Sequence, residues 1–312
     1  QLQHLVNAGA LIRVRPGEFT LPEQWSGADT MARHRELVLR TAERVATPQV
    51  YAYHAAAALW GIRMLRGWPP RVDVLVERSG GGRSSGRLRR RTVGFADREV
   101  VDLHGLLVTS PAQTVVDLAT ELPFTDAVVA ADSAIGTLLH RPPPTTLDEL
   151  RERVAASGSR RRILRARAAI AEASPLSGSV AESDSRVKLL LLGFPRPELQ
   201  HRFVTAHGTF YADFYWPSHG HVGECDGREK YADPRILGGR TPQEVFRAEK
   251  LREHSIRALE EVRGFSRWEP ADLVALPRLY DRLVADGLPS RLPRPTDATL
   301  TQARAALLRV AR

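Results

Sequence analysis

Three acidic residues lie within stretches that otherwise have the pattern of buried β-strands. Asp213 lies in "TFYADFYW", and Glu224 and Asp226 lie in "HVGECDG". The segment "PSHG" separates the two runs, which predicts an antiparallel hairpin with a four-residue turn. If Trp216 lies opposite His221, Asp213 falls opposite Glu224, with the two Cβ atoms about 5 Å apart.

Carboxylates that converge in an apolar sheet repel one another, so a positive partner is needed. Glu224 and Asp226 are two residues apart and share a strand face. Oxygen ligands without a thiol or imidazole cluster suit Mg²⁺ or Mn²⁺. We therefore predict that Asp213, Glu224 and Asp226 bind one of these ions. The alternatives are exposed acids at strand ends, an ordinary hairpin of a protein-interaction domain, or a zinc site that includes the neighbouring His219 and His221.

The elements around these acids follow a recognisable order. A capping-box spacing that begins at Ser179 precedes an apolar run and predicts a helix over 179–192. Three short strand-like runs follow, and "TPQE" at 241–244 opens a long amphipathic helix that Gly264 closes. "GFSRW" is then a final strand. The predicted order is helix, three strands, helix, strand.

With these motifs, residues 179–268 resemble the core of the PD-(D/E)XK nucleases, especially the domains related to very-short-patch-repair endonucleases. The resemblance implies a restriction-endonuclease-like fold and metal-dependent hydrolysis of DNA phosphodiester bonds. It casts Glu182 as the acid of the first helix and Asp213 as the central metal-binding acid. Glu224 becomes the first acid of the signature, with Asp226 completing the shell of the ion.

The signature departs from this family at one position, because Asp226 stands where the lysine is expected. Only three of the 45 basic residues are lysines, and all three follow residue 180. A lysine retained among so many arginines indicates a place that needs a compact ammonium. Lys230 or Lys250 is therefore the candidate to orient or activate the attacking water. If neither does so, the domain would bind DNA without cutting it.

The first half of the chain points to nucleic acid as a partner. The net charge of the whole chain is +9, and the positive field of such a protein attracts polyanions. "HLVNAGALIRVRPGEFTLP" predicts a helix and a small hairpin, like the back half of a winged helix, with Arg13 and Arg15 at the phosphates. The segment 78–91 is rich in glycine, serine and arginine, which predicts a mobile loop that orders on DNA. The alternatives are a simple surface hairpin and a solvated loop. The DNA-contacting candidates in the loop are Arg83, Arg87, Arg89, Arg90 and Arg91.

Two segments of this half, "GALIRVRPGEFTLP" and "VYAYHAAAALWGI", are similar to the AbiEi-type antitoxins of type IV toxin–antitoxin systems. Those proteins combine a winged helix with a second domain and repress their own promoters. The resemblance implies an alternative function, a DNA-binding repressor whose nuclease-like module does not cut. A cognate toxin or a second copy of the chain is the candidate protein partner.

The predicted fold class is α/β, of the α+β type. We expect a partial winged helix (1–28), a mixed α/β middle domain (29–174), a nuclease-like domain (175–275) and a helical tail (276–312). A single cysteine allows no intrachain disulfide, which fits a reducing compartment. No apolar run approaches the roughly 20 residues that cross a bilayer. We therefore expect a soluble cytoplasmic protein with no membrane partner.

Overall fold

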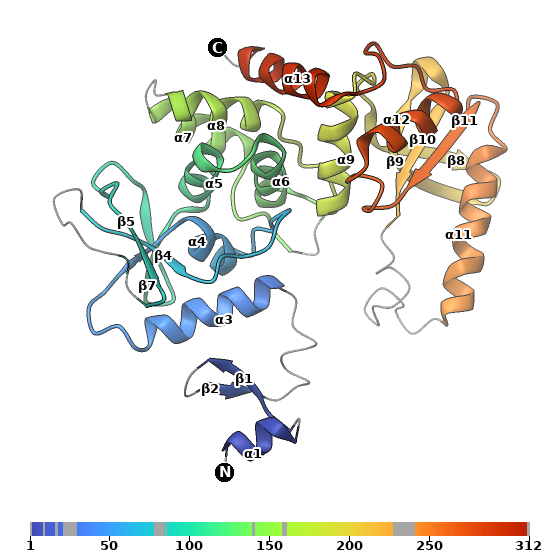
Figure 1. The fold of residues 1–312 in the computed structure, drawn as a ribbon. Helices are drawn as coiled ribbons and strands as arrows, with labels where there is room; N and C mark the ends of the chain where they lie inside the picture. The colour runs from blue at the N-terminus through green and yellow to red at the C-terminus, as the bar shows by residue number, and fades with distance from the viewer. Residues whose placement is uncertain are drawn as a thin grey trace. The chain divides into compact units, whose positions relative to one another are not determined.

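The computed structural model describes residues 2–8, 10–15, 18–20, 30–77, 84, 86–138, 141–157, 161–226 and 241–310. The chain divides into two compact units, Gln1–Leu118 and Ala119–Arg312. Each unit contains a mixed β-sheet with helices packed beside it (Figure 1). The protein therefore belongs to the α+β class that the sequence predicts.

The first unit begins with helix α1 (Leu2–Asn7), which is followed by an antiparallel hairpin of β1 (Ile12–Arg15) and β2 (Glu18–Thr20). The predicted order of a helix and a small hairpin is confirmed. The side chains of Arg13 and Arg15 lie outside the described part of the structure, so their phosphate contacts stay a prediction.

Five strands form the sheet of the first unit in the order β5-β4-β3-β7-β6, with parallel and antiparallel neighbours. Helices α3 (Thr30–Ala42) and α4 (Tyr53–Trp60) contribute to its core. The four alanines 55–58 of α4 are fully buried, so this alanine-rich helix packs closely in the core. The strands are β3 (Val50–Tyr51), β4 (Val72–Leu75), β5 (Leu88–Arg91), β6 (Val100–Leu103) and β7 (Leu106–Thr109).

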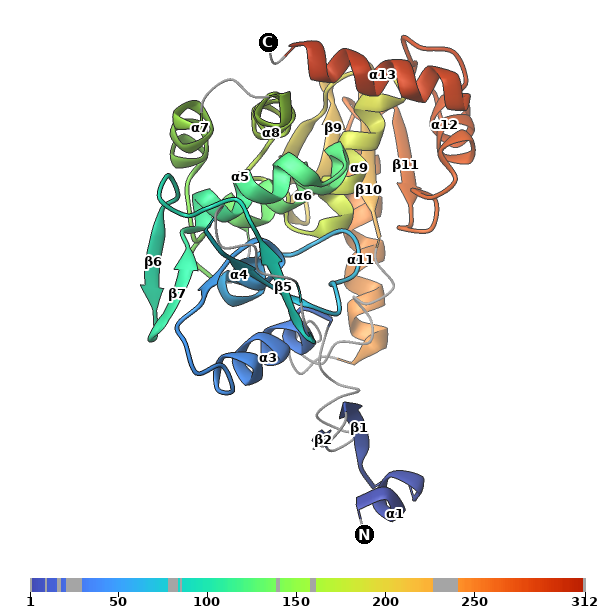
Figure 2. The same ribbon diagram turned by 60° about the vertical axis from the view of Figure 1, so that its left-hand side comes forward.

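A group of helices connects the two sheets along the chain, and the boundary between the units falls within α5 (Pro111–Glu121). α7 and α8 form a pair of packed helices within this group. α6 packs against both α8 and α9, so these helices belong to the second unit (Figure 2). The bounds are Phe124–Ile135 for α6, Leu147–Ala156 for α7, Arg161–Ala171 for α8 and Val180–Leu191 for α9.

Four strands form the sheet of the second unit in the order β11-β10-β9-β8, and only the pair β10–β11 is parallel. The predicted order of helix, three strands, helix and strand is confirmed. The second helix, α11 (Pro242–Arg257), ends before Gly264. The strands are β8 (Glu198–Thr205), β9 (Gly208–Trp216), β10 (His221–Cys225) and β11 (Gly264–Trp268).

Helices cover both faces of this sheet. One face contributes Trp216 and Trp268 to a core shared with α9 and α12 (Leu276–Ala285). The other face contributes Tyr215 to a core that includes Ile256 of α11. Helix α13 (Asp297–Val310) packs against α8 and α9. The sheet is therefore held between α9 and α12 on one face and α11, which lies between β10 and β11 in the chain, on the other.

A glycine allows the two tryptophans to approach β10. A Cβ added to Gly223 would lie 2.8 Å from the ring of Trp268 and 2.9 Å from the ring of Trp216. These distances are too short for real contacts, so the position requires glycine while both rings stay in the core. Gly223 thereby fixes the strand next to Glu224, the first acid of the signature.

Candidate active site

The hairpin that carries the acids has the predicted turn. Residues 217–220 connect β9 to β10 through a single 3₁₀ turn. The predicted register is also confirmed, because Trp216 pairs with His221 and two more pairs follow. The ladder ends one step before Asp213 and Glu224, so these acids are not a ladder pair.

Strand β9 loses its regular alternation at Asp213. Ala212 points to the core under α11, whereas Phe214 points to the opposite core under α9 and α12. Residues two apart share a face in a regular strand, so the strand is irregular between them, as at a bulge. β8 is interrupted opposite this position, at Gln200, which has a φ of 50°. A non-glycine residue in this conformation costs about 1–3 kcal/mol and persists only where its surroundings hold it.

The interruption turns the Asp213 carboxylate toward backbone and amide donors. Its Oδ2 accepts a hydrogen bond from the Cys225 N–H at 3.0 Å, and its Oδ1 accepts one from Gln200 Nε2 at 3.5 Å. Gln200 Nε2 also donates to Glu182 Oε2 at 3.2 Å. Glu182 receives the Gly178 N–H at 2.9 Å instead of completing the reciprocal bond of the predicted capping box. The structure thus connects two of the predicted catalytic acids through one amide.

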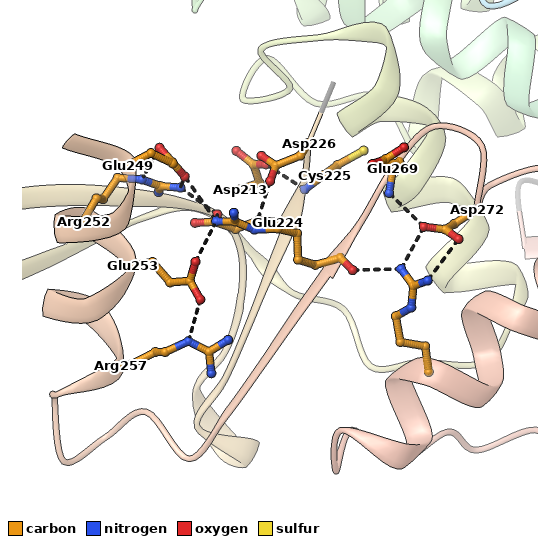
Figure 3. Close-up of polar contacts among 12 residues, drawn as sticks. Asp213, Glu224, Cys225, Asp226, Glu249, Arg252, Glu253, Arg257, Glu269 and Asp272 are labelled. Atoms are coloured by element: carbon orange, nitrogen blue, oxygen red, sulfur yellow. Dashed lines mark hydrogen bonds and ion pairs between the residues drawn. The ribbon is translucent and has the colours of Figure 1, made fainter. Parts of the chain in front are cut away.

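A second group of acids converges at the end of β10. One carboxylate oxygen from each of Glu224, Asp226 and Glu249 lies within 4.8 Å of the others (Figure 3). Two of the three are predicted metal ligands, and Glu249 comes from α11. Asp213 is not a member of this group. The predicted set of Asp213, Glu224 and Asp226 is therefore replaced here by a set with Glu249, because Asp213 turns to the amide of Cys225.

Sequence reasoning missed Glu249, although α11 carries a signal for it. Glu249 and Glu253 are four residues apart and therefore lie on one side of the helix, near Arg252. All three are only half-buried, whereas Ile256 on this side is fully buried in the core against the sheet. When one face of a helix carries charged residues beside a core residue, the charged residues also face the sheet. This pattern indicates a polar site on the sheet.

Two arginines hold this acid group. Arg252 Nη2 contacts Glu224 Oε2 and Glu249 Oε1, each at 2.6 Å. Arg267 Nη2 contacts the same two oxygens at 2.8 and 3.2 Å, and its Nε lies 2.9 Å from Asp226 Oδ2. Arg267 occupies this place because its residue pairs with Glu224 in the parallel ladder of β10 and β11. The positive charge predicted to come from an ion comes in part from these side chains.

Glu224 is the most buried member of the acid group, with 1% of the residue exposed. Burial raises the pKa of Glu224 and Asp213 adds to the rise, while Arg252 and Arg267 oppose it. Its Oε2 receives both arginines, whereas its Oε1 has no hydrogen-bond partner within the described part of the chain. Leaving a buried carboxylate oxygen without a partner is costly. The site therefore has capacity for one more electropositive group.

Of the two candidate catalytic lysines, the structure describes Lys250. Lys250 lies on the exposed face of α11, with its Nζ 5.8 Å from the centre of the Phe246 ring. Lys188 contacts Asp184 at 2.6 Å, one turn earlier in α9. Lys230 lies outside the described residues. Lys250 is thus on a different side of α11 from Glu249 and Arg252, and it does not take the position expected of the catalytic lysine.

Two of the predicted DNA-contacting arginines have partners inside the first unit. Arg89 Nη2 donates to Asp73 Oδ2 at 2.9 Å, and Arg91 Nε donates to Asp73 Oδ1 at 2.8 Å. Asp73 is fully buried in β4, next to β5, which carries both arginines. This part of the predicted loop is therefore a strand with a structural ion pair. Of the other candidates, Arg87 and Arg90 are half-buried and Arg83 lies outside the described residues.

The two histidines considered for zinc have other partners. His221 is buried and its Nε2 lies 2.9 Å from Ser266 Oγ, which donates to Asp286 Oδ2 at 2.6 Å. His219 Nδ1 lies 2.9 Å from Ser218 Oγ. Across the described ranges, neither joins a group of side chains that could hold a metal ion. The thiol of Cys225 is buried as well, which raises its pKa to about 12 and keeps it protonated.

Comparison with known proteins finds relatives without an assigned activity. Two uncharacterized proteins of Mycobacterium tuberculosis, one from strain CDC 1551 / Oshkosh and one from strain ATCC 25618 / H37Rv, are each 29% identical to this chain over 188 residues. The matched region is 58% of this chain and 66% of each relative. No protein-family model matches the chain. Among the helices that the structure describes, none has the length and apolar character needed to span a membrane.

Proposed function

We propose that this chain is a DNA-binding protein whose second unit hydrolyses DNA phosphodiester bonds with a bound Mg²⁺ or Mn²⁺. The observation that carries the proposal is Glu224, a buried carboxylate with one oxygen that has no hydrogen-bond partner in the described chain. It stands in a group of three carboxylates whose oxygens approach within 4.8 Å. Glu224, Asp226 and Glu249 are the residues that would hold the ion.

The chemistry of these donors fits a hard divalent cation. All three are carboxylate oxygens, which Mg²⁺ and Mn²⁺ prefer. Among the described residues around the site, acids are more numerous than arginines. Those acids are Asp213, Glu224, Asp226, Glu249 and Glu253, and the arginines are Arg252, Arg257 and Arg267.

The ion would lower the pKa of a bound water and neutralise charge that grows on the phosphate. The protein side chains have separate tasks. Gln200 holds Asp213 and Glu182 in fixed positions beside the group, so either carboxylate is placed to accept a proton from water. Arg252 and Arg267 cannot act as bases because a guanidinium stays protonated, but they can stabilise negative charge on a phosphate.

The order of elements supports a PD-(D/E)XK-like assignment for residues 179–268. A helix, three antiparallel strands, a helix and a parallel strand follow one another, and the acids lie at adjoining positions of the central strands. α1 and the β1–β2 hairpin support a partial winged helix in the same way. In this proposal the basic first unit contributes phosphate contacts, so binding weakens as the salt concentration rises.

The test is nicking of supercoiled plasmid DNA by the full chain in Mg²⁺ or Mn²⁺, with EDTA as the blank. We expect cutting by the native chain and at least a hundredfold loss in Glu224→Gln and Glu249→Gln. Glu260→Gln is the matched control, because Glu260 is an exposed acid just beyond the end of α11. Calorimetry with Mn²⁺ should show binding that both site variants lose. Equal cutting by all four proteins would overturn the proposal.

A second candidate is a DNA-binding repressor with a module that does not cut, of the kind found in AbiEi-type antitoxins. The observation in its favour is Asp226, which stands in the signature where a lysine is expected and forms an ion pair with Arg267. This function predicts a gel shift with the promoter region of its own gene and no nicking in either metal. Light scattering with and without a candidate toxin would test the proposed partners, a cognate toxin or a second copy of the chain.

A further inference from the structure

Two carboxylates of the acid group are also the ones that the two arginines contact. Glu224 Oε2 lies 2.6 Å from Arg252 Nη2 and 2.8 Å from Arg267 Nη2. Glu249 Oε1 lies 2.6 Å from the first nitrogen and 3.2 Å from the second. Both guanidiniums therefore converge on two carboxylates that also belong to the candidate metal site.

A cation at the acid group must therefore compete with the arginines. Mg²⁺ binds carboxylate oxygens at about 2.0–2.1 Å and Ca²⁺ at about 2.3–2.6 Å, which is closer than most of these nitrogens lie. Its charge repels both guanidiniums and competes with them for the negative charge of the carboxylates that they contact. Cation binding should therefore loosen the contacts of Arg252 and Arg267 with Glu224 and Glu249.

The loosened arginines would not retreat into the core. The side chains of Arg252 and Arg267 are 20% and 30% exposed, so both already reach solvent. Arg252 keeps an anchor, because its Nη1 donates to the Tyr211 carbonyl at 2.9 Å. The guanidinium of Arg267 lies 5.9 Å from the centre of the Phe265 ring. Two forked donors thus stay at the surface beside the ion, where phosphate oxygens are their natural ligands.

We propose that Arg252 and Arg267 form a phosphate-binding pair for the nucleic-acid backbone, which becomes available when a divalent cation binds the neighbouring carboxylates. The inference rests on the proposed function, since it uses the same metal site. It adds that cation and nucleic acid bind cooperatively. Linkage requires the effect to be mutual, so DNA also tightens cation binding by the same factor.

The test measures binding of a fluorescein-labelled DNA duplex by anisotropy, with the full chain in Ca²⁺ or in EDTA at constant ionic strength. Ca²⁺ replaces the catalytic ion so that the duplex stays intact during the titration. We expect Ca²⁺ to tighten binding by the native chain about tenfold, within the usual range of coupling between two sites. Arg252→Gln and Arg267→Gln should each reduce that factor to below about threefold.

The matched control is Arg278→Gln, which removes an exposed positive charge from α12 in the same unit. It should weaken DNA binding slightly and equally in Ca²⁺ and in EDTA, because it lies outside the shared contacts. If Ca²⁺ tightens binding equally in all four proteins, or does not tighten it in the native chain, the inference is overturned. Failure of the native chain to bind the duplex has the same consequence.

A second variant guards against misfolding of the arginine variants. Glu249→Gln removes one of the two shared charges, so the arginines should be partly released without any cation. Its DNA affinity in EDTA should exceed that of Glu260→Gln, which has the same net charge. Equal affinities of these two variants would contradict the inference without reference to Arg252 or Arg267.

Two further arms separate the outcomes. Nicking in Mg²⁺ is measured in a separate experiment. Cooperative binding of cation and DNA without cutting would support this inference and contradict the proposed nuclease activity. Cutting without cooperative binding would support the nuclease activity and contradict this inference. A titration with inorganic phosphate tests the source of the ligand. If free phosphate shows the Ca²⁺-dependent coupling and the duplex does not, the assignment to nucleic acid is wrong.

Discussion

Gln200 of β8 and Asp213 of β9 lie opposite one another at the point where both strands lose their regular alternation, and the Gln200 amide donates to the Asp213 carboxylate at 3.5 Å. The same amide nitrogen donates to Glu182 at 3.2 Å. A single neutral side chain therefore separates two carboxylates at the edge of the candidate site. These hydrogen bonds explain how the strained conformation of Gln200 is kept within β8.

Gln200→Glu should destabilise the second unit. The substitution replaces a donor with a third carboxylate facing Asp213 and Glu182, so two hydrogen bonds become repulsions. We expect a loss of about 1–3 kcal/mol in the free energy of unfolding at pH 7. Urea denaturation followed by circular dichroism measures it, and Gln302→Glu on the exposed face of α13 is the control. A loss no larger than that of the control would show that the amide is not needed.

Arg252→Met should be strongly destabilising, because the buried carboxylate of Glu224 then loses one of the positive charges that contact it. Removing one partner of a buried ion pair costs about 3–5 kcal/mol of unfolding free energy. Because Arg267 still contacts Glu224, we expect a loss near the lower end of this range. The double variant Arg252→Met with Glu224→Met should recover most of the loss. A double-mutant cycle by urea denaturation tests this, and additive effects would contradict the coupling.

Arg89→Gln should lower the stability of the first unit more than it lowers nucleic-acid affinity. Arg89 contacts the buried Asp73, and Arg91 remains to compensate part of the charge. We expect a loss of about 1.5–3 kcal/mol. Arg90→Gln, in the same strand without a bond to Asp73, is the matched control. A lower thermal midpoint in both variants, by equal amounts, would show that the buried pair is unimportant.

The acid sensitivity of the second unit should depend on His221. Burial lowers the pKa of His221 from about 6.5 to about 4. The unfolded chain therefore binds this proton at a higher pH than the folded one, so the stabilising effect is complete above pH 6.5 and is lost as the pH falls toward 4. The loss is about 3 kcal/mol over this window.

His221→Gln removes the titrating group and keeps a donor for Ser266. It should flatten the decline of unfolding free energy between pH 6.5 and pH 4, measured by urea denaturation at closely spaced pH values. His207→Gln, at an exposed position between β8 and β9, is the control and should leave the slope unchanged. A slope that is the same in all three proteins would assign the acid sensitivity to other groups.

The sequence alone predicted much of the second unit. The helix at Ser179, the second capping box at Thr241 and the four-residue turn after Trp216 all depend on residues that are neighbours in the chain. Because a hairpin register follows from its turn, the pairing of Trp216 with His221 could also be derived. The acids on β10 were identified for the same reason, since alternation along one strand is a local property.

Only the tertiary structure decided which charges meet. Arg252 and Arg267 contact Glu224 across separations of 28 and 43 residues, and no local pattern encodes that meeting. One irregularity in β9 was enough to turn Asp213 away from the group formed with Glu249, because side-chain direction reverses with every inserted residue. The packing of α11 on the sheet likewise placed arginines, and not Lys250, beside the acids. Short-range rules determine the elements of this protein, but the chemistry of its site depends on contacts that form only when distant elements pack together.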